Sequence, residues 1–281
     1  MNEIETVAVK DPILNNDMPW LVFEAKNQHF AVNSASIVTI LQLNQKVTIM
    51  PDYPPNVRGV INFRGDIVPL LELRKVIGLK SFIEEEKEFD DMLEQRKTDH
   101  IHWADELERC IDAKENFTLA TDPHKCAFGK WYYNYKTDSQ AVSFVLGKIE
   151  EPHKLLHETA ENAMACERHC DTCKLAECKQ AALHKAKNMY VPTVLSLIDD
   201  AKEIFKASNH EMCIILTNGA IQIGLLVDAV DSVVSLEFMG DGGNFGGTYK
   251  SNFVESVAKS SEISTDILVL REDALFESIN D

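Results

Sequence analysis

The sequence contains no long apolar run and no export signal. No stretch approaches the roughly 18 uncharged apolar residues that a membrane-spanning helix needs. The first residues, Met-Asn-Glu-Ile-Glu-Thr-Val-Ala-Val-Lys-Asp-Pro, lack the basic, apolar and small-residue pattern of a secretory signal. We therefore expect a cytoplasmic protein with no membrane insertion.

Basic residues are few. The 281-residue chain has 28 lysines and arginines against 45 aspartates and glutamates, which gives a net charge of −17. This charge repels the phosphate backbone of nucleic acids and the head groups of anionic lipids. We therefore expect the partners to be proteins, and neither a nucleic acid nor a membrane surface.

Motifs of catalysis are missing as well. Residues 240–247 are rich in glycine but lack the Gly-Lys-Ser/Thr ending of a phosphate loop, so we expect a flexible loop there. The metalloprotease pattern needs a glutamate directly after the first of two helical histidines, and Lys154 follows His153. No nucleophile-base motif is apparent either, and we predict that the chain is not an enzyme.

Segments on both sides of the middle of the chain are predicted to form strands. Residues 57–64 and 67–73 are β-branched runs joined by a tight turn, and Pro69 favours an edge or bulged strand for the second. Residues 213–217 and 221–227 flank Asn218-Gly219, a strong hairpin signal.

The middle of the chain is predicted to be helical. Between residues 82 and 205 apolar side chains recur at spacings of three and four, as in a helical bundle. Two β segments around a helical block indicate a helical domain inserted into a loop of a β domain, with tandem domains as the alternative. The expected parts are a flexible N-terminus (1–17), the first β part (18–79), the helical insert (80–208) and the second β part (209–281).

Residues 59–74 resemble the signature of the CheW family of chemotaxis coupling proteins. They read Gly-Val-Ile-Asn-Phe-Arg-Gly-Asp-Ile-Val-Pro-Leu-Leu-Glu-Leu-Arg. Residues 223–236 and 267–270 are similar to later strands of that family, so the resemblance covers about 18–79 and 210–276. It implies an α+β fold with two small five-stranded β-barrel subdomains, and a role in bridging chemoreceptor signalling domains to the histidine kinase CheA.

Within this signature, Asn62, Arg64 and Gly65 are the candidate partner-binding residues. Arg64 stands at a hairpin corner, where its planar guanidinium suits a carboxylate or carbonyl of a partner. The alternative is an ion pair of Arg64 with an acid of its own domain. Thr39 stands before Ile40 where the family often has an acidic residue, so a contact made there is expected to differ.

The helical middle contains a second resemblance, over residues 82–206. His100-Ile-His-Trp, Cys126-Ala-Phe-Gly-Lys-Trp and His153-Lys-Leu-Leu-His resemble the motifs of the chemoreceptor zinc-binding (CZB) family. Two histidines four residues apart share a helical face and can converge on one ion. A thiolate and a third imidazole complete a tetrahedron with no open position. The candidate zinc ligands, for a structural or sensory site, are His100, Cys126, His153 and His157.

Other residues of the insert receive different roles. Three aromatic residues are expected to shield the metal from water: Trp103, Phe128 and Trp131. We assign no ligand role to His102 or His124, and we expect Cys110 and Cys213 to be buried apolar side chains.

Four cysteines form a separate cluster that the zinc-binding family does not share. Four thiols within thirteen residues suit a second zinc or an iron–sulfur cluster, redox-active thiols or disulfides, or inert side chains, and all three interpretations stay open. The cluster consists of Cys166, Cys170, Cys173 and Cys178.

The two resemblances together predict an adaptor between chemoreceptors and CheA whose zinc-binding insert modulates signalling. Oxidation of a zinc-bound Cys126 would remove a ligand and make the insert a redox or zinc sensor, and a static zinc site is the alternative. A different class of function, a zinc or redox sensor or a metal-handling protein outside chemotaxis, also stays open. Monomer and homodimer are not distinguished.

Overall fold

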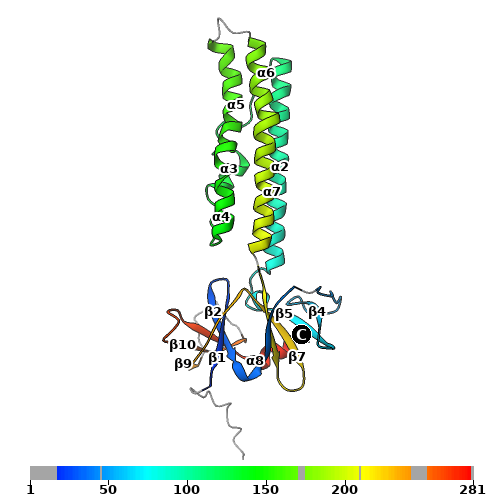
Figure 1. Ribbon diagram of the computed structural model, residues 1–281, viewed down its shortest axis with the longest axis vertical. Coiled ribbons are helices and arrows are strands. Elements are labelled where there is room, and N and C mark those ends of the chain that lie inside the picture. The colour runs from blue at the N-terminus through cyan, green and yellow to red at the C-terminus, as the bar shows by residue number, and fades with distance from the viewer. Residues whose placement is uncertain (1–17, 45, 170–174, 209, 242–251, 280–281) are drawn as a thin grey trace, which may run out of the picture. The chain divides into compact units, whose positions relative to one another are not determined.

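A computed structural model describes residues 18–44, 46–169, 175–208, 210–241 and 252–279. The flexible N-terminus expected for residues 1–17 and most of the glycine-rich segment lie outside these ranges. The chain divides into two units, residues 1–81 with 210–281 and residues 82–209, and each is described by itself (Figure 1).

The first unit contains two β-sheets. The first has the order β8-β1-β2-β11-β10-β9, with strands β1 (Trp20–Ala25), β2 (Gln28–Asn33), β8 (Ala229–Val234), β9 (Glu237–Asp241), β10 (Val254–Lys259) and β11 (Ile267–Leu270). The second has the order β3-β6-β7-β5-β4, with strands β3 (Ile37–Gln42), β4 (Val57–Phe63), β5 (Asp66–Glu72), β6 (Met212–Thr217) and β7 (Gln222–Val227). Three short helices accompany them: η1 (Ser34–Ser36), α1 (Leu73–Val76) and α8 (Glu272–Glu277).

Both sheets combine strands from before and after the helical segment. In the first sheet β2 pairs in parallel with β11, and in the second β5 pairs in parallel with β7. The main apolar core of this unit also draws on both parts, for example Phe23 and Phe30 from the first and Ile214, Leu225 and Leu275 from the second. The two β parts therefore fold as one unit, since neither part contains a whole sheet.

The strand that contains Pro69 lies inside its sheet. β5 is bonded to β4 on one side and to β7 on the other, so the predicted edge position is wrong. The irregularity in the β4–β5 pairing lies between Val57 and Gly59 rather than at Pro69. Parallel pairing with β7 begins only at Leu70, so the N–H that Pro69 lacks is not needed on that side.

Charged side chains join the two β parts. The Arg58 guanidinium on β4 bonds to both oxygens of Glu211, one of them at 2.7 Å, and donates from Nε to Glu72 at 2.9 Å. Arg74 and Asp228 form a second pair, with Nη2 and Oδ2 2.6 Å apart. The Arg58–Glu211 and Arg74–Asp228 pairs join residues from opposite sides of the helical segment in sequence, so these two pairs tie the two parts together.

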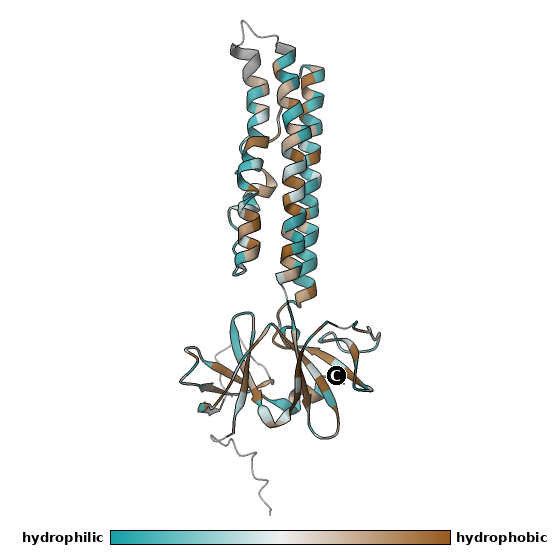
Figure 2. Cartoon of the chain, in the orientation of Figure 1, coloured by the Kyte–Doolittle hydropathy of each residue, from teal (hydrophilic) through white to brown (hydrophobic). Residues whose placement is uncertain are grey.

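The second unit is helical. Its elements are α2 (Phe82–Ala113), α3 (Ala127–Tyr132), α4 (Gln140–Gly147), α5 (Glu150–His169), α6 (Leu175–Lys185), the π-helical turn η2 (Ala186–Tyr190) and α7 (Val191–Ser208). The long helices carry apolar and polar bands in turn (Figure 2), as amphipathic helices do. Among the described residues, no helix is both long and apolar enough to cross a membrane.

The helices α2 and α7 run antiparallel. Near the start of α2, Phe89 stacks on Phe205 with ring centroids 4.2 Å apart. Farther along α2, Lys187 of η2 pairs with Asp105 at 2.8 Å. The first and last residues of the helical unit therefore lie at the same end of this helix pair.

Pro192 explains the π-helical turn before α7. It offers no N–H to the carbonyl of Asn188 and its ring crowds that turn, and the widened turn over Ala186–Tyr190 accommodates both effects. The predicted bundle thus contains an irregularity that its apolar periodicity did not indicate.

Candidate metal centre

Four side chains from three places in the helical unit meet at one point. Their ligand atoms all lie within 4.8 Å of one another. His100 comes from α2, Cys126 caps the N-terminus of α3, and His153 and His157 come from α5. The three histidines are buried and Cys126 is half-buried.

Backbone carbonyls orient two of the imidazoles. The Nδ1 atom of His100 lies 2.7 Å from the carbonyl oxygen of Arg96, and Nδ1 of His157 lies 2.9 Å from that of Ala120. A carbonyl only accepts hydrogen bonds, so each Nδ1 carries the proton. Each Nε2 then presents a lone pair, which is the form that binds a metal.

The remaining nitrogens face one another and the sulfur. The Nε2 atoms of His157 and His153 are 3.1 Å apart, and Nε2 of His153 is 3.2 Å from Sγ of Cys126. Nε2 of His100 is buried without a hydrogen-bond partner. Such an orphaned buried acceptor is costly unless another atom satisfies it.

This donor set fits a zinc ion. Bonds of about 2.0–2.3 Å in a tetrahedron place neighbouring ligand atoms about 3.3–3.7 Å apart. The observed separations of 3.1 and 3.2 Å need little adjustment to reach that range. Three imidazoles and one thiolate are ligands that zinc prefers, and an ion would satisfy the orphaned Nε2 of His100.

Burial sets the protonation state of the site. Burial, with the neighbouring His100 and His157, lowers the pKa of His153 to about 2. Burial and His100 lower the pKa of His157 to about 4. Burial also raises the pKa of the Cys126 thiol above its ordinary value. At neutral pH the imidazoles are ready to coordinate, whereas the thiol needs the metal to lose its proton.

The surroundings of Gly129 explain why the Cys126-Ala-Phe-Gly motif ends in glycine. Its N–H donates to Sγ of Cys126 at 3.1 Å. A Cβ atom at Gly129 would lie 1.8 Å from the carbonyl oxygen of Pro123, which is a backbone atom and cannot easily move away. Only glycine lets the segment before α3 pass close enough to place the cysteine in the site.

Aromatic rings surround the histidines. The Phe128 ring is buried edge-on against His153, with centroids 4.9 Å apart. Trp103 is buried against His157 at 5.0 Å. Trp131 is half-buried and packs on Phe128 at 5.7 Å, one layer farther from the site.

Two other histidines stay outside this group. His102 is exposed, and His124 is exposed and stacks on the ring of Tyr133 with centroids 4.0 Å apart. The sequence did not indicate the carbonyls of Arg96 and Ala120. Arg96 stands four residues before His100, a helical spacing that could have suggested it, but nothing in the sequence marks Ala120.

The cysteine cluster falls mostly outside the described residues. Cys170 and Cys173 lie in an undescribed segment, and Cys166 lies on α5 but its side chain is not described. Cys178 is half-buried near the start of α6. The metal or redox role of this cluster therefore stays a prediction.

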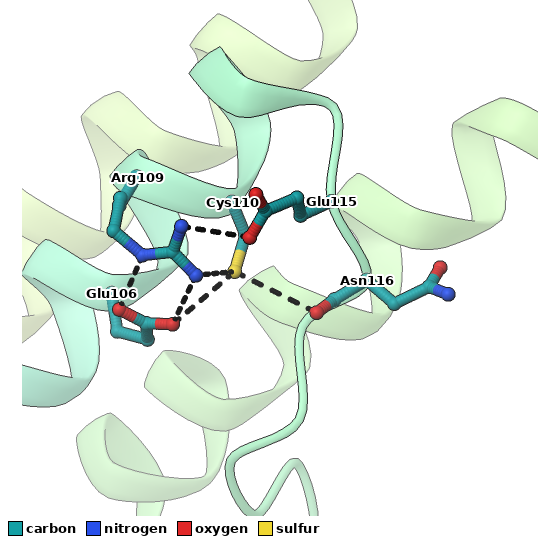
Figure 3. A network of polar contacts seen from close by, with 5 residues as sticks. All are labelled: Glu106, Arg109, Cys110, Glu115 and Asn116. Carbon is teal, nitrogen blue, oxygen red and sulfur yellow. Dashed lines mark hydrogen bonds and ion pairs between the residues drawn. The ribbon is translucent and has the colours of Figure 1, made fainter.

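Cys110 and Cys213 are buried, as predicted. Cys110 lies in a polar network at the end of α2, where Arg109 pairs with Glu106 and Glu115 (Figure 3). Its Sγ contacts Glu106 at 3.5 Å and the Asn116 carbonyl at 3.7 Å. Burial raises the pKa of Cys110, so its thiol stays protonated and poorly reactive.

The partner-binding candidates lie in the tight turn between β4 and β5. Arg64 and Gly65 have positive φ angles of 55° and 100°, and Asn62 Oδ1 accepts the Gly65 N–H at 3.1 Å. Arg64 is exposed, with its guanidinium 4.9 Å from the centroid of the Phe63 ring. Within the described part of the chain Arg64 makes no ion pair, and both the partner-binding role and the alternative of an acid partner in its own domain stay predictions.

Comparison with known families gives two matches. Residues 19–89 match the CheW-like domain, a segment that includes the turn at Arg64. Residues 100–164 match the chemoreceptor zinc-binding domain, a segment that includes all four candidate ligands. Comparison with curated proteins gives no match.

Among solved structures, the chain is similar to the scaffolding protein TtCheW from Thermoanaerobacter tengcongensis. The two are 13% identical, 92% of each chain is covered, and the TM-score is 0.42. The family matches do not depend on this similarity. The chain combines a CheW-like domain with a chemoreceptor zinc-binding domain.

Proposed function

We propose that the chain is a cytoplasmic adaptor that couples chemoreceptors to the histidine kinase CheA and is not itself an enzyme. The observation that carries this proposal is the CheW-like match over residues 19–89, in which the turn at Arg64 presents an exposed guanidinium. An exposed arginine that has no acid partner among the described residues is suited to bind a carboxylate of another protein.

We also propose that the CheW-like domain has two parts, residues 18–79 and 209–281, around a zinc-binding insert at 80–208. The antiparallel pairing of α2 and α7 supports an insertion, because it brings the first and last residues of the helical unit together. Only two residues separate β8 from β9, although these strands lie at opposite ends of their sheet order. That order favours a sheet curled into a barrel, and the long helices favour a four-helix bundle.

The insert is proposed to bind one zinc ion at His100, Cys126, His153 and His157. Zinc supplies a positive charge that holds Cys126 as a thiolate and links the ligands. These residues come from α2, α3 and α5, so the site would fasten three elements at once. The four-cysteine cluster remains a candidate for a second metal or a redox site.

Cys126 is the ligand that solvent reaches most easily, since the three histidines are buried and it is only half-buried. With hydrogen peroxide as oxidant, the thiolate would attack one peroxide oxygen, giving Cys126 sulfenic acid and hydroxide. A sulfenic acid is a poor ligand, so this step would loosen the packing of α3 on its neighbours. We propose this as the route by which the insert modulates the adaptor.

The adaptor role is tested by replacing Arg64 in the full chain. Arg64→Glu should reduce recovery of the chain with CheA and with a chemoreceptor signalling domain, because it reverses the charge of the turn. Arg271→Glu, an exposed arginine in the same unit, makes an equal change of charge and should bind normally. Unchanged binding of Arg64→Glu, with binding lost on deletion of residues 82–206, would show that the roles are assigned to the wrong units.

The redox proposal needs a separate test. The protein would be oxidised mildly, modified cysteines mapped by mass spectrometry, and CheA activity measured in reconstituted receptor arrays. Oxidation at Cys126 that leaves kinase activity unchanged, together with a Cys126→Ser variant that signals normally, would favour a static zinc site. Zinc binding without any binding to CheA or receptors would instead favour a metal-handling protein outside chemotaxis.

A further inference from the structure

We propose that Trp103 is a positioning residue of the metal centre, acting on His157 through the carbonyl group of Ala120. The Trp103 Nε1–H donates to the Ala120 oxygen at 2.8 Å, and Nδ1 of His157 lies 2.9 Å from the same oxygen. This inference rests on the proposed zinc site and concerns how one of its ligands is held.

A carbonyl oxygen has two lone pairs, so it can accept from the indole and the imidazole together. Trp103 comes from α2 and His157 from α5, and Ala120 lies in the segment between α2 and α3. Both side chains are buried, Trp103 being 5% and His157 0% exposed. Water therefore does not compete readily for either hydrogen bond.

The Ala120 carbonyl needs such an anchor. Among the described residues, no backbone-to-backbone hydrogen bond involves residues 116–121. The Trp103 ring contacts this segment a second time at Phe117, with centroids 5.1 Å apart and planes at 83°. Trp103 thus fixes a stretch of chain that lacks secondary structure at two points.

The other two imidazoles are held differently. The acceptor for His100 is the carbonyl of Arg96 in the same helix, which the helix itself keeps in place. Nδ1 of His153 is buried and has no hydrogen-bond partner. Among the three imidazoles, only His157 is therefore oriented by a carbonyl outside a helix. The Trp103 indole also donates a hydrogen bond to that carbonyl.

If Trp103 acted only through packing, a different result would be expected. Trp103 belongs to the apolar cluster that contains Leu107 and Leu156, and loss of its ring would destabilise that cluster whether or not it positions a ligand. The distinction requires removal of the indole N–H while the size and shape of the ring are kept.

The test uses the full chain with Trp103→3-benzothienylalanine, in which sulfur replaces the indole N–H. The control is the same replacement at Trp131, whose ring packs on Phe89 and Phe128. Zinc affinity is measured by competition with a chromophoric chelator, and the His157 ring state by ¹⁵N NMR of the zinc-loaded protein. Zinc-free samples are compared by circular dichroism, and Trp103→Phe serves as a second variant.

We expect the Trp103 replacement to weaken zinc binding about 10- to 100-fold, the usual effect of losing a group that orients a metal ligand. Its His157 signals should show a second orientation or tautomer. The Trp131 replacement should retain wild-type affinity. Wild-type affinity and a single His157 state in the Trp103 variant would overturn the positioning role alone. A wild-type chain that binds no zinc would overturn the proposed metal centre, and the positioning role with it.

Discussion

Burial of three imidazoles determines what the candidate metal centre can do. An imidazole removed from water favours its neutral form, and the burial of His153 and His157 lowers the pKa of each well below its ordinary value of 6.5. The neutral form is also the ligand form. The same burial that makes these residues ready to bind a metal makes them destabilising when they must be protonated.

This leads to a prediction for the zinc-free protein. The unfolded chain binds protons at these histidines below about pH 6.5, whereas the folded chain does not until the pH reaches the lowered pKa values. As the pH is lowered from about 7 to about 5, the free energy of unfolding should therefore decrease by about 2 kcal/mol per buried imidazole. Urea unfolding in the presence of a chelator measures it.

A pair of variants isolates the effect. His157→Gln should show a smaller loss of stability over this pH range than the wild type, because one protonatable imidazole is gone. His102→Gln, at an exposed position, should behave as the wild type. Equal pH dependence in all three proteins would contradict the proposed cause.

Two glycines of the helical unit allow another prediction. Gly129→Ala should destabilise the unit by about 1–3 kcal/mol or more, because the new Cβ meets the Pro123 carbonyl oxygen. Gly147→Ala on α4 makes the same chemical change where nothing lies within 4 Å, and should be neutral or slightly stabilising. Thermal unfolding compares them, and a similar effect of both would show that the close approach at Gly129 is not tight.

The candidate ligands were accessible to sequence reasoning. Of the two carbonyls that orient them, the helical spacing could have suggested that of Arg96, but nothing in the sequence indicated that of Ala120. His153 and His157 stand four residues apart, which is enough to predict that they share a helical face. His100 and Cys126 were predicted only because their motifs resemble those of a known family. The Ala120 carbonyl could not be predicted, since every residue has a carbonyl and only the three-dimensional path of the segment brings this one to His157.

At the scale of elements, the buried guanidinium of Arg58 links β4 to Glu72 of the neighbouring strand β5 and to Glu211, which is distant in sequence. The Arg58 and Glu72 side chains are 8% and 9% exposed, and the second acid, Glu211, lies just before β6. Loss of the guanidinium would leave two carboxylates with little solvent and no counter-charge. Breaking a buried pair in this way is expensive.

We therefore expect Arg58→Met to lower the free energy of unfolding of the β unit by about 3–5 kcal/mol. Arg64→Met removes the same group at an exposed turn and should change it by less than about 0.5 kcal/mol. Chemical denaturation followed by circular dichroism distinguishes the two. A small effect at Arg58 would show that solvent reaches its carboxylates.

Sequence patterns predicted whether a segment forms a helix or a strand better than they predicted which strands pair with one another. The Asn218-Gly219 turn does connect two paired strands, and the apolar positions Val194, Ile198 and Ala201 are all buried on α7. The position of β5 inside its sheet was missed, because the parallel partner β7 comes from a segment about 150 residues later. Local sequence signals do not record such distant pairing.

At the scale of the whole molecule, each unit contains its own apolar cores. The core of the β unit combines strands from both ends of the chain, whereas the cores of the helical unit draw only on residues 82–209. A metal in the helical unit should therefore stabilise that unit alone.

Calorimetry should show two unfolding transitions, of which zinc raises only one. Free zinc at 1,000 times its Kd would stabilise the helical unit by about 4 kcal/mol. The Cys126→Ser and His157→Ala variants should lose the shift while keeping the other transition. A single transition that zinc shifts as a whole would show that the two units unfold together.

The zinc content and zinc coordination of the purified full chain test the proposed metal centre. Elemental analysis should find about one zinc per chain, and X-ray absorption should show three nitrogen ligands at about 2.0 Å and one sulfur at about 2.3 Å. His157→Ala should lose most of this zinc. A zinc-free protein, or a zinc bound by four sulfurs and retained in His157→Ala, would contradict the proposed zinc site. The second result would place the metal at the four-cysteine cluster.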